Sequence, residues 1–210
     1  MVVQEITRVT DRRRRILLAD GTSFVLYAGE VRSHHIEAGA DIADETLKMI
    51  REEVLTRRAR LRCLNLLKSM DRTQQQLRRR LSLDGYPKEV IDDALAYAAS
   101  FHYTDDARYA ENYVRQMSGR RSRKQIEWEL REKGIPKDLI PGAFETETGE
   151  DADLAAALRF ARKRNYDPET AAPDETRKFA QFLMRKGFSG STIRKVVSHT
   201  LPDSVPDGIF

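Results

Sequence analysis

The chain has 210 residues, of which 40% are hydrophobic and 33% are charged. This composition is typical of one large or two small folded domains and excludes wholesale disorder. No apolar run approaches the roughly 18 residues of a membrane helix, and no basic-then-apolar leader is visible. We therefore expect a soluble cytoplasmic protein without a membrane partner. The single cysteine, Cys63, has no partner for an internal disulfide and is expected to be a small buried side chain.

The formal net charge of +4 is unevenly distributed along the chain. Residues 51–140 hold 20 Lys and Arg against 14 Asp and Glu, whereas the segments before and after them are close to neutral. A basic middle segment indicates a polyanionic partner, either nucleic acid or an acidic protein surface. A well-solvated helical surface has the same composition, so charge alone leaves both interpretations open.

The first 30 residues have a β-type pattern that differs from everything after them. Short β-type runs occupy residues 6–9, 15–18 and 23–27, and Asp20-Gly21 favours a tight hairpin between the last two. We predict a small antiparallel sheet here and no strand beyond Gly39. The pattern then becomes helical, with Asp44 as the expected N-cap of the first long helix.

From about residue 59 the chain repeats a unit of three helices. In the first copy, Thr73 and Gln76 are spaced as a capping box, Leu77 and Leu81 share one helical face, and Gly85 suits the residue after the helix. A proline then opens the next helix. Because each helix is short and its apolar stripe narrow, stacked copies are needed to form a continuous core.

The second copy keeps this spacing, and the third is looser. Ser122 and Gln125 form the second expected box, and cap and glycine are 12 residues apart in both copies. In the third, Asp174 is the expected cap, displaced by one position, and Gly187 the glycine. Residues 145–153 are expected to form an acidic linker, and residues 165–173 a long loop.

The predicted fold is therefore mostly α: a tandem array of three three-helix repeats with a small N-terminal antiparallel β segment. The predicted domains are an N-terminal β segment (1–43), a linking helix with the first repeat (44–101), the second repeat (102–145), the third repeat (146–201) and a frayed tail (202–210).

Motifs of the common enzyme classes are missing. The sequence has no phosphate-binding loop, dinucleotide-binding glycine motif, nucleophile elbow or zinc-protease motif. The four histidines are scattered and have no cysteine partners. Asp105 and Asp106 fit an N-cap or a first-turn anion of a helix better than an acid–base pair. We predict a protein that is not an enzyme and needs neither a cofactor nor a metal.

Basic clusters on the repeats are the positive indication of a binding surface. Leu77 and Leu81 fix the buried face of their helix, so Arg78 to Arg80 turn mostly outward, where guanidinium groups can pair with phosphates or carboxylates. For each cluster, a solvated helix face is the alternative. The candidate partner- or nucleic-acid-binding residues are Arg78, Arg79, Arg80, Arg120, Arg121, Arg123, Lys124, Arg131, Lys133, Arg162, Lys163, Arg164, Arg185 and Lys186.

The arginine stripe does not recur in the second copy, where Glu127, Trp128 and Glu129 take the matching positions. Trp128 lies roughly opposite the buried face of its helix. It either packs against a neighbouring repeat or is exposed to bind a partner. Packing between repeats is favoured because exposed tryptophan is unfavourable in a soluble protein.

Three segments resemble the RecX family of bacterial recombination regulators over residues 59–200. They are T-x-x-Q-L-x-x-x-L-x-x-x-G-Y-P-x-x-V-I at Thr73–Ile91, Y-T-D-D-A-R-Y-A-E-N-Y-V at Tyr103–Val114 and G-I-P at Gly134–Pro136. The resemblance implies a cytoplasmic, monomeric repeat protein of DNA recombination and repair with no enzymatic site. It implies that the chain binds the RecA recombinase filament in its helical groove. By this binding it would inhibit or modulate three activities of the filament: extension, ATP hydrolysis and strand exchange.

In this interpretation DNA is contacted weakly or through the filament, by the basic residues of the matching repeats. The third copy departs from the family pattern in its capping residues and its missing proline. Two alternatives stay open: a general DNA-binding helical protein that acts without recombinase, and a scaffold for an acidic protein.

Overall fold

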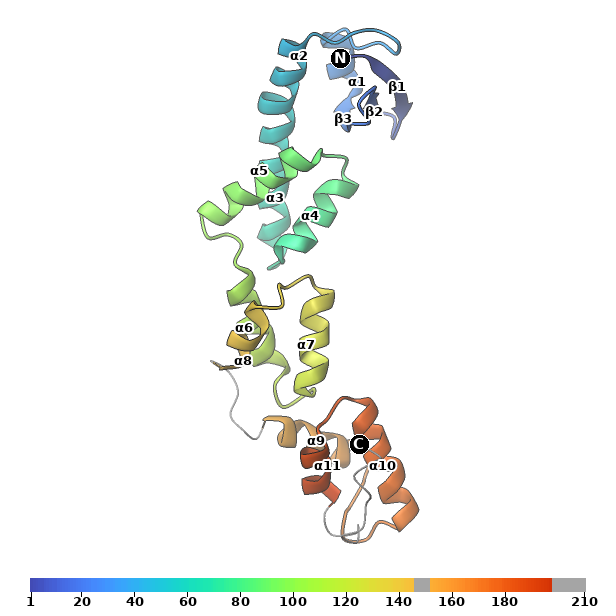
Figure 1. Cartoon of the computed structure of the whole chain (residues 1–210), viewed down its shortest axis with the longest axis vertical. Helices are drawn as coiled ribbons and strands as arrows, with labels where there is room; N and C mark the ends of the chain where they lie inside the picture. The colour runs from blue at the N-terminus through green and yellow to red at the C-terminus, as the bar shows by residue number, and fades with distance from the viewer. Residues whose placement is uncertain (146–151, 198–210) are drawn as a thin grey trace. The chain divides into compact units, whose positions relative to one another are not determined.

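The computed structural model describes residues 1–145 and 152–197. It divides into two compact units, Met1–Asp105 and Asp106–Phe210, which are described separately. The predicted fold class is confirmed, since helices follow a small N-terminal antiparallel sheet (Figure 1). The predicted tail, and the linker apart from its ends, fall outside the described residues.

The N-terminal sheet has the strand order β1-β2-β3, and both strand pairs are antiparallel. Ile16 of the central strand lies opposite Ile6 on one side and Phe24 on the other. The turn at Asp20-Gly21 forms as predicted, with Gly21 at a φ of 83°. The strands are β1 (Val3–Arg8), β2 (Arg13–Leu18) and β3 (Ser23–Tyr27).

A short helix, α1 (Ala28–Ser33), follows the sheet and was not predicted. It has six residues, none of them buried, so it has no apolar stripe to reveal it in the sequence. Arg58 forms an ion pair with Glu30 of this helix and lies over the Tyr27 ring, 4.5 Å from its centroid. These contacts join the N-terminal segment to the first repeat.

One continuous helical segment runs through α2 (Asp44–Met49), a π-helical stretch η1 (Ile50–Thr56) and α3 (Arg57–Ser69). In the wider π turn, the Thr56 hydroxyl donates to the Arg51 carbonyl five residues earlier, at 2.9 Å. The N-cap is Ala43, so the prediction of Asp44 as the cap is wrong by one position. Asp44 is instead the first helical residue, where its charge favours the helix dipole.

The first repeat is completed by α4 (Gln74–Leu83) and α5 (Lys88–Ser100). The predicted capping box forms, because Thr73 Oγ1 accepts from the Gln76 N–H at 3.1 Å and Gln76 accepts from the Thr73 N–H at 3.3 Å. Gly85 has a φ of 91°, and a Cβ there would collide with Val25 of β3. The sheet and the first repeat share one hydrophobic core.

The second repeat consists of α6 (Asp106–Met117), α7 (Arg123–Glu132) and α8 (Leu139–Glu145), which surround their own core (Figure 1). Its capping box is only half formed. Ser122 accepts from the Gln125 N–H at 3.2 Å, but the Gln125 amide donates to Glu129 at 3.1 Å and does not reach back to the cap. Gln125 is drawn away because Glu129 offers a charged acceptor.

The third repeat consists of α9 (Ala152–Lys163), α10 (Pro173–Arg185) and α11 (Gly190–Val197). The N-cap of α10 is Ala172, with Pro173 in the first turn, so the prediction of Asp174 as the cap is wrong. The predicted long loop is present and anchored. Tyr166 is buried within it and stacks on Phe179, with ring centroids 4.1 Å apart.

The third repeat contacts the second at the start of α7. The Ser122 hydroxyl donates to the Lys186 carbonyl at 2.6 Å, and the Arg123 N–H donates to Asp153 Oδ1 at 2.7 Å. Gly187, at a φ of 84°, lies so close that an added Cβ would be 3.1 Å from Ser122 Oγ. The C-terminal end of α10 therefore packs against the N-terminus of α7.

Candidate nucleic-acid and partner interface

The single cysteine is buried and protonated. Cys63 is fully buried as predicted, and burial raises the pKa of its thiol to about 11, so it is protonated at neutral pH. Within residues 1–145 and 152–197, no group of three or more His, Cys, Asp or Glu side chains is placed to hold a metal ion. No helix among these residues has the length and apolarity to cross a membrane.

The arginine stripe of α4 is largely engaged within its own repeat. Arg78 forms an ion pair with Asp92 of α5, and Arg80 lies 3.7 Å from Asp84. The pairing with Arg78, and then with Lys88, holds the pKa of Asp92 below its ordinary value. Arg79 alone in this stripe is exposed and has no ion-pair partner in the described part of the chain.

Two arginines of the second repeat are also engaged. Arg121 forms an ion pair with Glu129, and Arg123 lies 3.0 Å from Glu127 while its guanidinium stacks over the Phe144 ring at 4.4 Å. Partial burial opposes ionisation of Glu129, but hydrogen bonds from Arg121 and Tyr113 outweigh it and lower the pKa of this carboxyl. Burial, and the hydrogen bond that Tyr113 donates to Glu129, raise the pKa of Tyr113 to about 12.

Other predicted residues cover aromatic rings. Arg164 lies 3.8 Å from the centroid of Phe182, with Lys186 over the same ring at 5.9 Å, and Lys133 lies 5.0 Å from the centroid of Tyr113. The predicted residues that remain are exposed and make no ion pair or ring contact within the described residues. We call them the unpaired cations: Arg79, Arg120, Lys124, Arg131, Arg162, Lys163 and Arg185.

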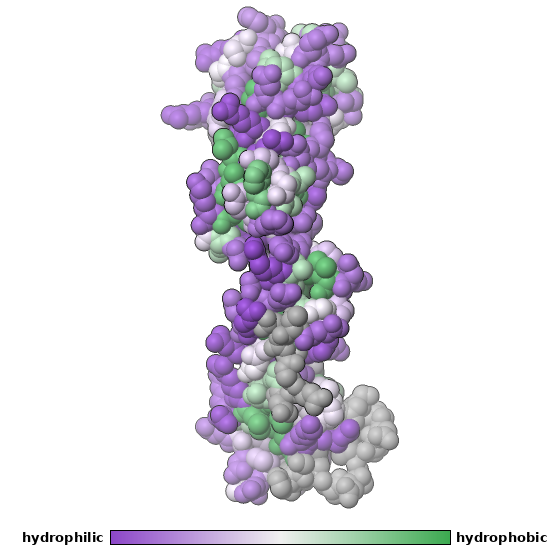
Figure 2. All heavy atoms as spheres, turned by 90° about the vertical axis from the view of Figure 1, so that its left-hand side faces the viewer, coloured by the Kyte–Doolittle hydropathy of each residue, from purple (hydrophilic) through white to green (hydrophobic). Residues whose placement is uncertain are grey.

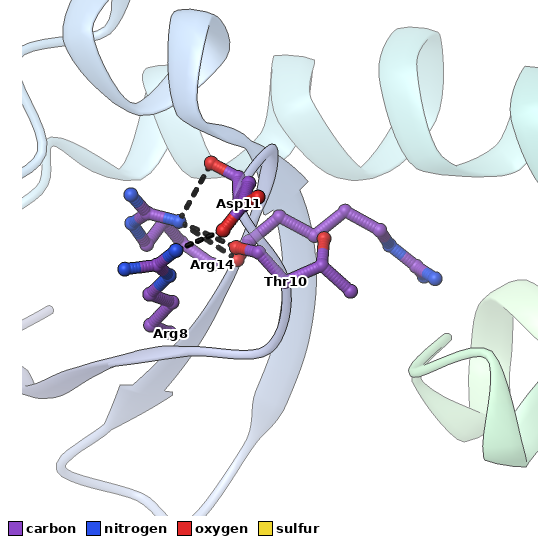
Figure 3. A network of polar contacts seen from close by, with 5 residues as sticks. Arg8, Thr10, Asp11 and Arg14 are labelled. Atoms are coloured by element: carbon purple, nitrogen blue, oxygen red, sulfur yellow. Dashed lines mark hydrogen bonds and ion pairs between the residues drawn. The ribbon is translucent and has the colours of Figure 1, made fainter.

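A basic turn between β1 and β2 was missed in the sequence. Figure 3 shows Arg8 and Arg14 converging on this turn, where Arg8 forms an ion pair with Asp11 and Arg14 donates to the Thr10 carbonyl at 2.9 Å. The neighbouring Arg12 is exposed. The signal is the run of four arginines at 12–15, of which only Arg15 falls in a predicted strand.

Trp128 contradicts its prediction. Its side chain is 58% exposed on α7, so it is not buried against a neighbouring repeat. The helical geometry was predicted correctly, since Ile126 and Leu130 are buried on the opposite face. Hydrophilic side chains dominate the face of the molecule shown in Figure 2, and its hydrophobic areas are interrupted. Trp128 is one of several large hydrophobic side chains exposed among the described residues, with Leu83 and Phe101.

Models of three RecX domains match the chain in sequence order. The first three-helix domain of RecX matches residues 59–97, the second matches 105–142 and the third matches 150–197. Together these matches cover more than half of the chain.

The chain belongs to the RecX family.

Relatives and solved structures agree with this assignment. The regulatory protein RecX of Lacticaseibacillus paracasei is 25% identical over 98% of this chain and 88% of its own length. That of Clostridium botulinum is 23% identical over 94% of both chains, and that of Vibrio vulnificus 30% identical over 64% of this chain and 88% of its own.

Two crystal structures of RecX proteins resemble the fold. One, described as regulatory protein RecX, has a TM-score of 0.60 and 24% identity over 94% of this chain and 98% of its own. The RecX structure from Lactobacillus salivarius has a TM-score of 0.57 and 25% identity over 69% of this chain and 95% of its own. Both support the RecX repeat architecture, and the family is one of regulatory proteins.

Proposed function

We propose that this chain regulates DNA recombination and repair by binding the RecA filament on DNA, in its helical groove. There it limits filament extension, ATP hydrolysis and strand exchange, as a cytoplasmic monomer without catalysis of its own. The observation that carries this proposal is the match of all three RecX domains, in order, to residues 59–197. The unpaired cations on successive repeats support a polyanionic partner.

Assays of RecA-driven strand exchange and ATP hydrolysis test the proposal directly. Adding the full chain in amounts stoichiometric with RecA should slow both reactions. A saturating amount that leaves both rates unchanged would refute the proposal. The chain should also have no effect on a RecA-independent ATPase run as a control.

The first-repeat contact is tested by two arginines of one stripe. Arg79→Ala should weaken filament binding, because this cation has no competing ion pair. Arg78→Ala is the matched control, since Arg78 is engaged with Asp92 and the loss of such a surface pair changes stability by only about 0–1 kcal/mol. Equal filament binding by both variants and the unmodified chain, measured by co-sedimentation, would reduce the stripe to a solvated surface.

The alternative of a general DNA-binding protein is favoured by the exposed arginines of the β1–β2 turn and by the unpaired cations. Direct phosphate binding weakens log-linearly with salt, because bound counterions are released. Strong affinity for naked DNA with this salt dependence, together with unchanged RecA activities, would favour the alternative. A scaffold for an acidic protein would show neither effect.

A further inference from the structure

The outward face of α7 combines an exposed aromatic ring with unpaired cations. Trp128 is 58% exposed at the centre of this face. Lys124 precedes it by four residues and Arg131 follows it by three, so both lie on the same side of the helix as the indole. Both cations are exposed and have no ion-pair partner in the described part of the chain.

The acidic residues next to Trp128 are largely neutralised. Glu127 lies 3.0 Å from Arg123, and Glu129 accepts hydrogen bonds from Tyr113 at 2.6 Å and from Gln125 at 3.1 Å, besides its ion pair with Arg121. Glu132, four residues after Trp128, is the acid that remains exposed on this face.

We propose that Lys124, Trp128 and Arg131 form a binding site for single-stranded nucleic acid, in which Trp128 stacks on a base and the two cations contact the flanking phosphates. Charge complementarity and ring exposure favour this occupant. Aromatic side chains bind single strands by stacking on bases of any sequence, while cations follow the backbone. A duplex offers no free base face, so this site discriminates single strands from duplexes. The site does not depend on RecA.

The chain reports on this site directly, because Trp128 is its single tryptophan. Titration of the full chain with oligothymidylate, in the absence of recombinase, should quench the tryptophan fluorescence. A duplex of the same length should not reproduce the quenching. If the oligonucleotide saturates the protein, as measured by its own fluorescence anisotropy, and the tryptophan signal does not change, the proposal is overturned.

Variants separate stacking from charge. Trp128→Ala should bind labelled oligothymidylate about 5-fold to 150-fold more weakly, which is the range expected for one base–aromatic stack. Trp128→Phe should retain part of the affinity. Since Trp128 is exposed, both variants should keep the helical circular dichroism of the unmodified chain. Unchanged affinity of a folded Trp128→Ala would contradict the proposal.

The charge contribution is tested by salt dependence. The slope of log affinity against log salt is negative. The double variant Lys124→Ala/Arg131→Ala should make it less steep, by about 0.7 per lost cation. The matched control, Lys48→Ala/Lys68→Ala, removes the same charge from exposed lysines of the other unit and should change it less. Glu132→Gln should strengthen binding. Equal slopes for the two double variants would overturn the site.

A protein partner is the competing occupant. If RecA without DNA quenches the Trp128 fluorescence and oligothymidylate does not, α7 is a protein-docking face and the nucleic-acid site is wrong. This result would leave the proposed regulation of RecA intact, so the two proposals can fail separately.

Discussion

At the scale of single residues, Glu129 is held by three partners in the second repeat. Its carboxylate accepts from Tyr113 and Gln125 and forms an ion pair with Arg121, and only 12% of its side chain is exposed. Hydrogen bonds to a carboxylate favour its charged form and so lower its pKa. Glu129 therefore links α6, α7 and the turn between them through one charged group.

The linkage of Glu129 predicts a loss of stability in acid. Because the folded-state pKa of Glu129 is below its ordinary value of 4.5, the stabilisation is present above about pH 4.5 and is lost as the pH falls through the folded-state pKa. Glu129→Gln should be less stable than the unmodified chain at pH 7. The difference between the two should shrink below pH 4.5, as followed by urea unfolding with circular dichroism. A difference independent of pH would contradict the linkage.

At the scale of elements, the glycines that follow the middle helices define the packing. All three predicted glycines, Gly85, Gly134 and Gly187, have positive φ values, of 91°, 82° and 84°. Gly85 also packs against β3 and Gly187 against the start of α7. The sequence predicted the conformation from the spacing of cap and glycine, but the contacted surface depends on residues more than 50 positions away.

Replacement of Gly85 tests the packing of the sheet on the first repeat. Gly85→Ala adds a left-handed backbone penalty of about 1–2 kcal/mol and a clash with Val25 that costs roughly 1–3 kcal/mol more. Gly21→Ala is the control, because Gly21 has a similar φ of 83° and open space around it. The free energy of unfolding of both variants measures the contact. Equal losses would show that β3 does not press on Gly85.

Ser122 is expected to contribute both to α7 and to the seating of the third repeat. Ser122→Ala removes a helix cap, which costs about 1 kcal/mol, and leaves the Lys186 carbonyl without its hydroxyl donor. Amide hydrogen exchange should therefore accelerate at the end of α10 as well as at the start of α7. Ser191→Ala, at an exposed position of α11, should affect neither. Faster exchange confined to α7 would contradict the role of Ser122 between repeats.

At the scale of the whole chain, the repeats and the hairpin could be predicted from the sequence, but the ion pairs between helices could not. Local spacing of caps, apolar pairs and glycines predicted the three repeats and the hairpin at Gly21. Ion pairs such as Arg78 with Asp92 join separate helices, so the sequence could not show which cations are free. The prediction that Trp128 packs against a repeat is wrong, because its position opposite the buried Ile126 and Leu130 leaves the indole exposed.

We propose that this RecX-family chain binds the RecA filament. Co-sedimentation with RecA assembled on single-stranded DNA with a non-hydrolysable nucleotide tests it most directly, beside the same DNA without RecA. The chain should sediment with the filament at salt concentrations that abolish its binding to naked DNA. If it sediments equally with filament and naked DNA at every salt concentration, or never with the filament, the proposed filament binding is wrong.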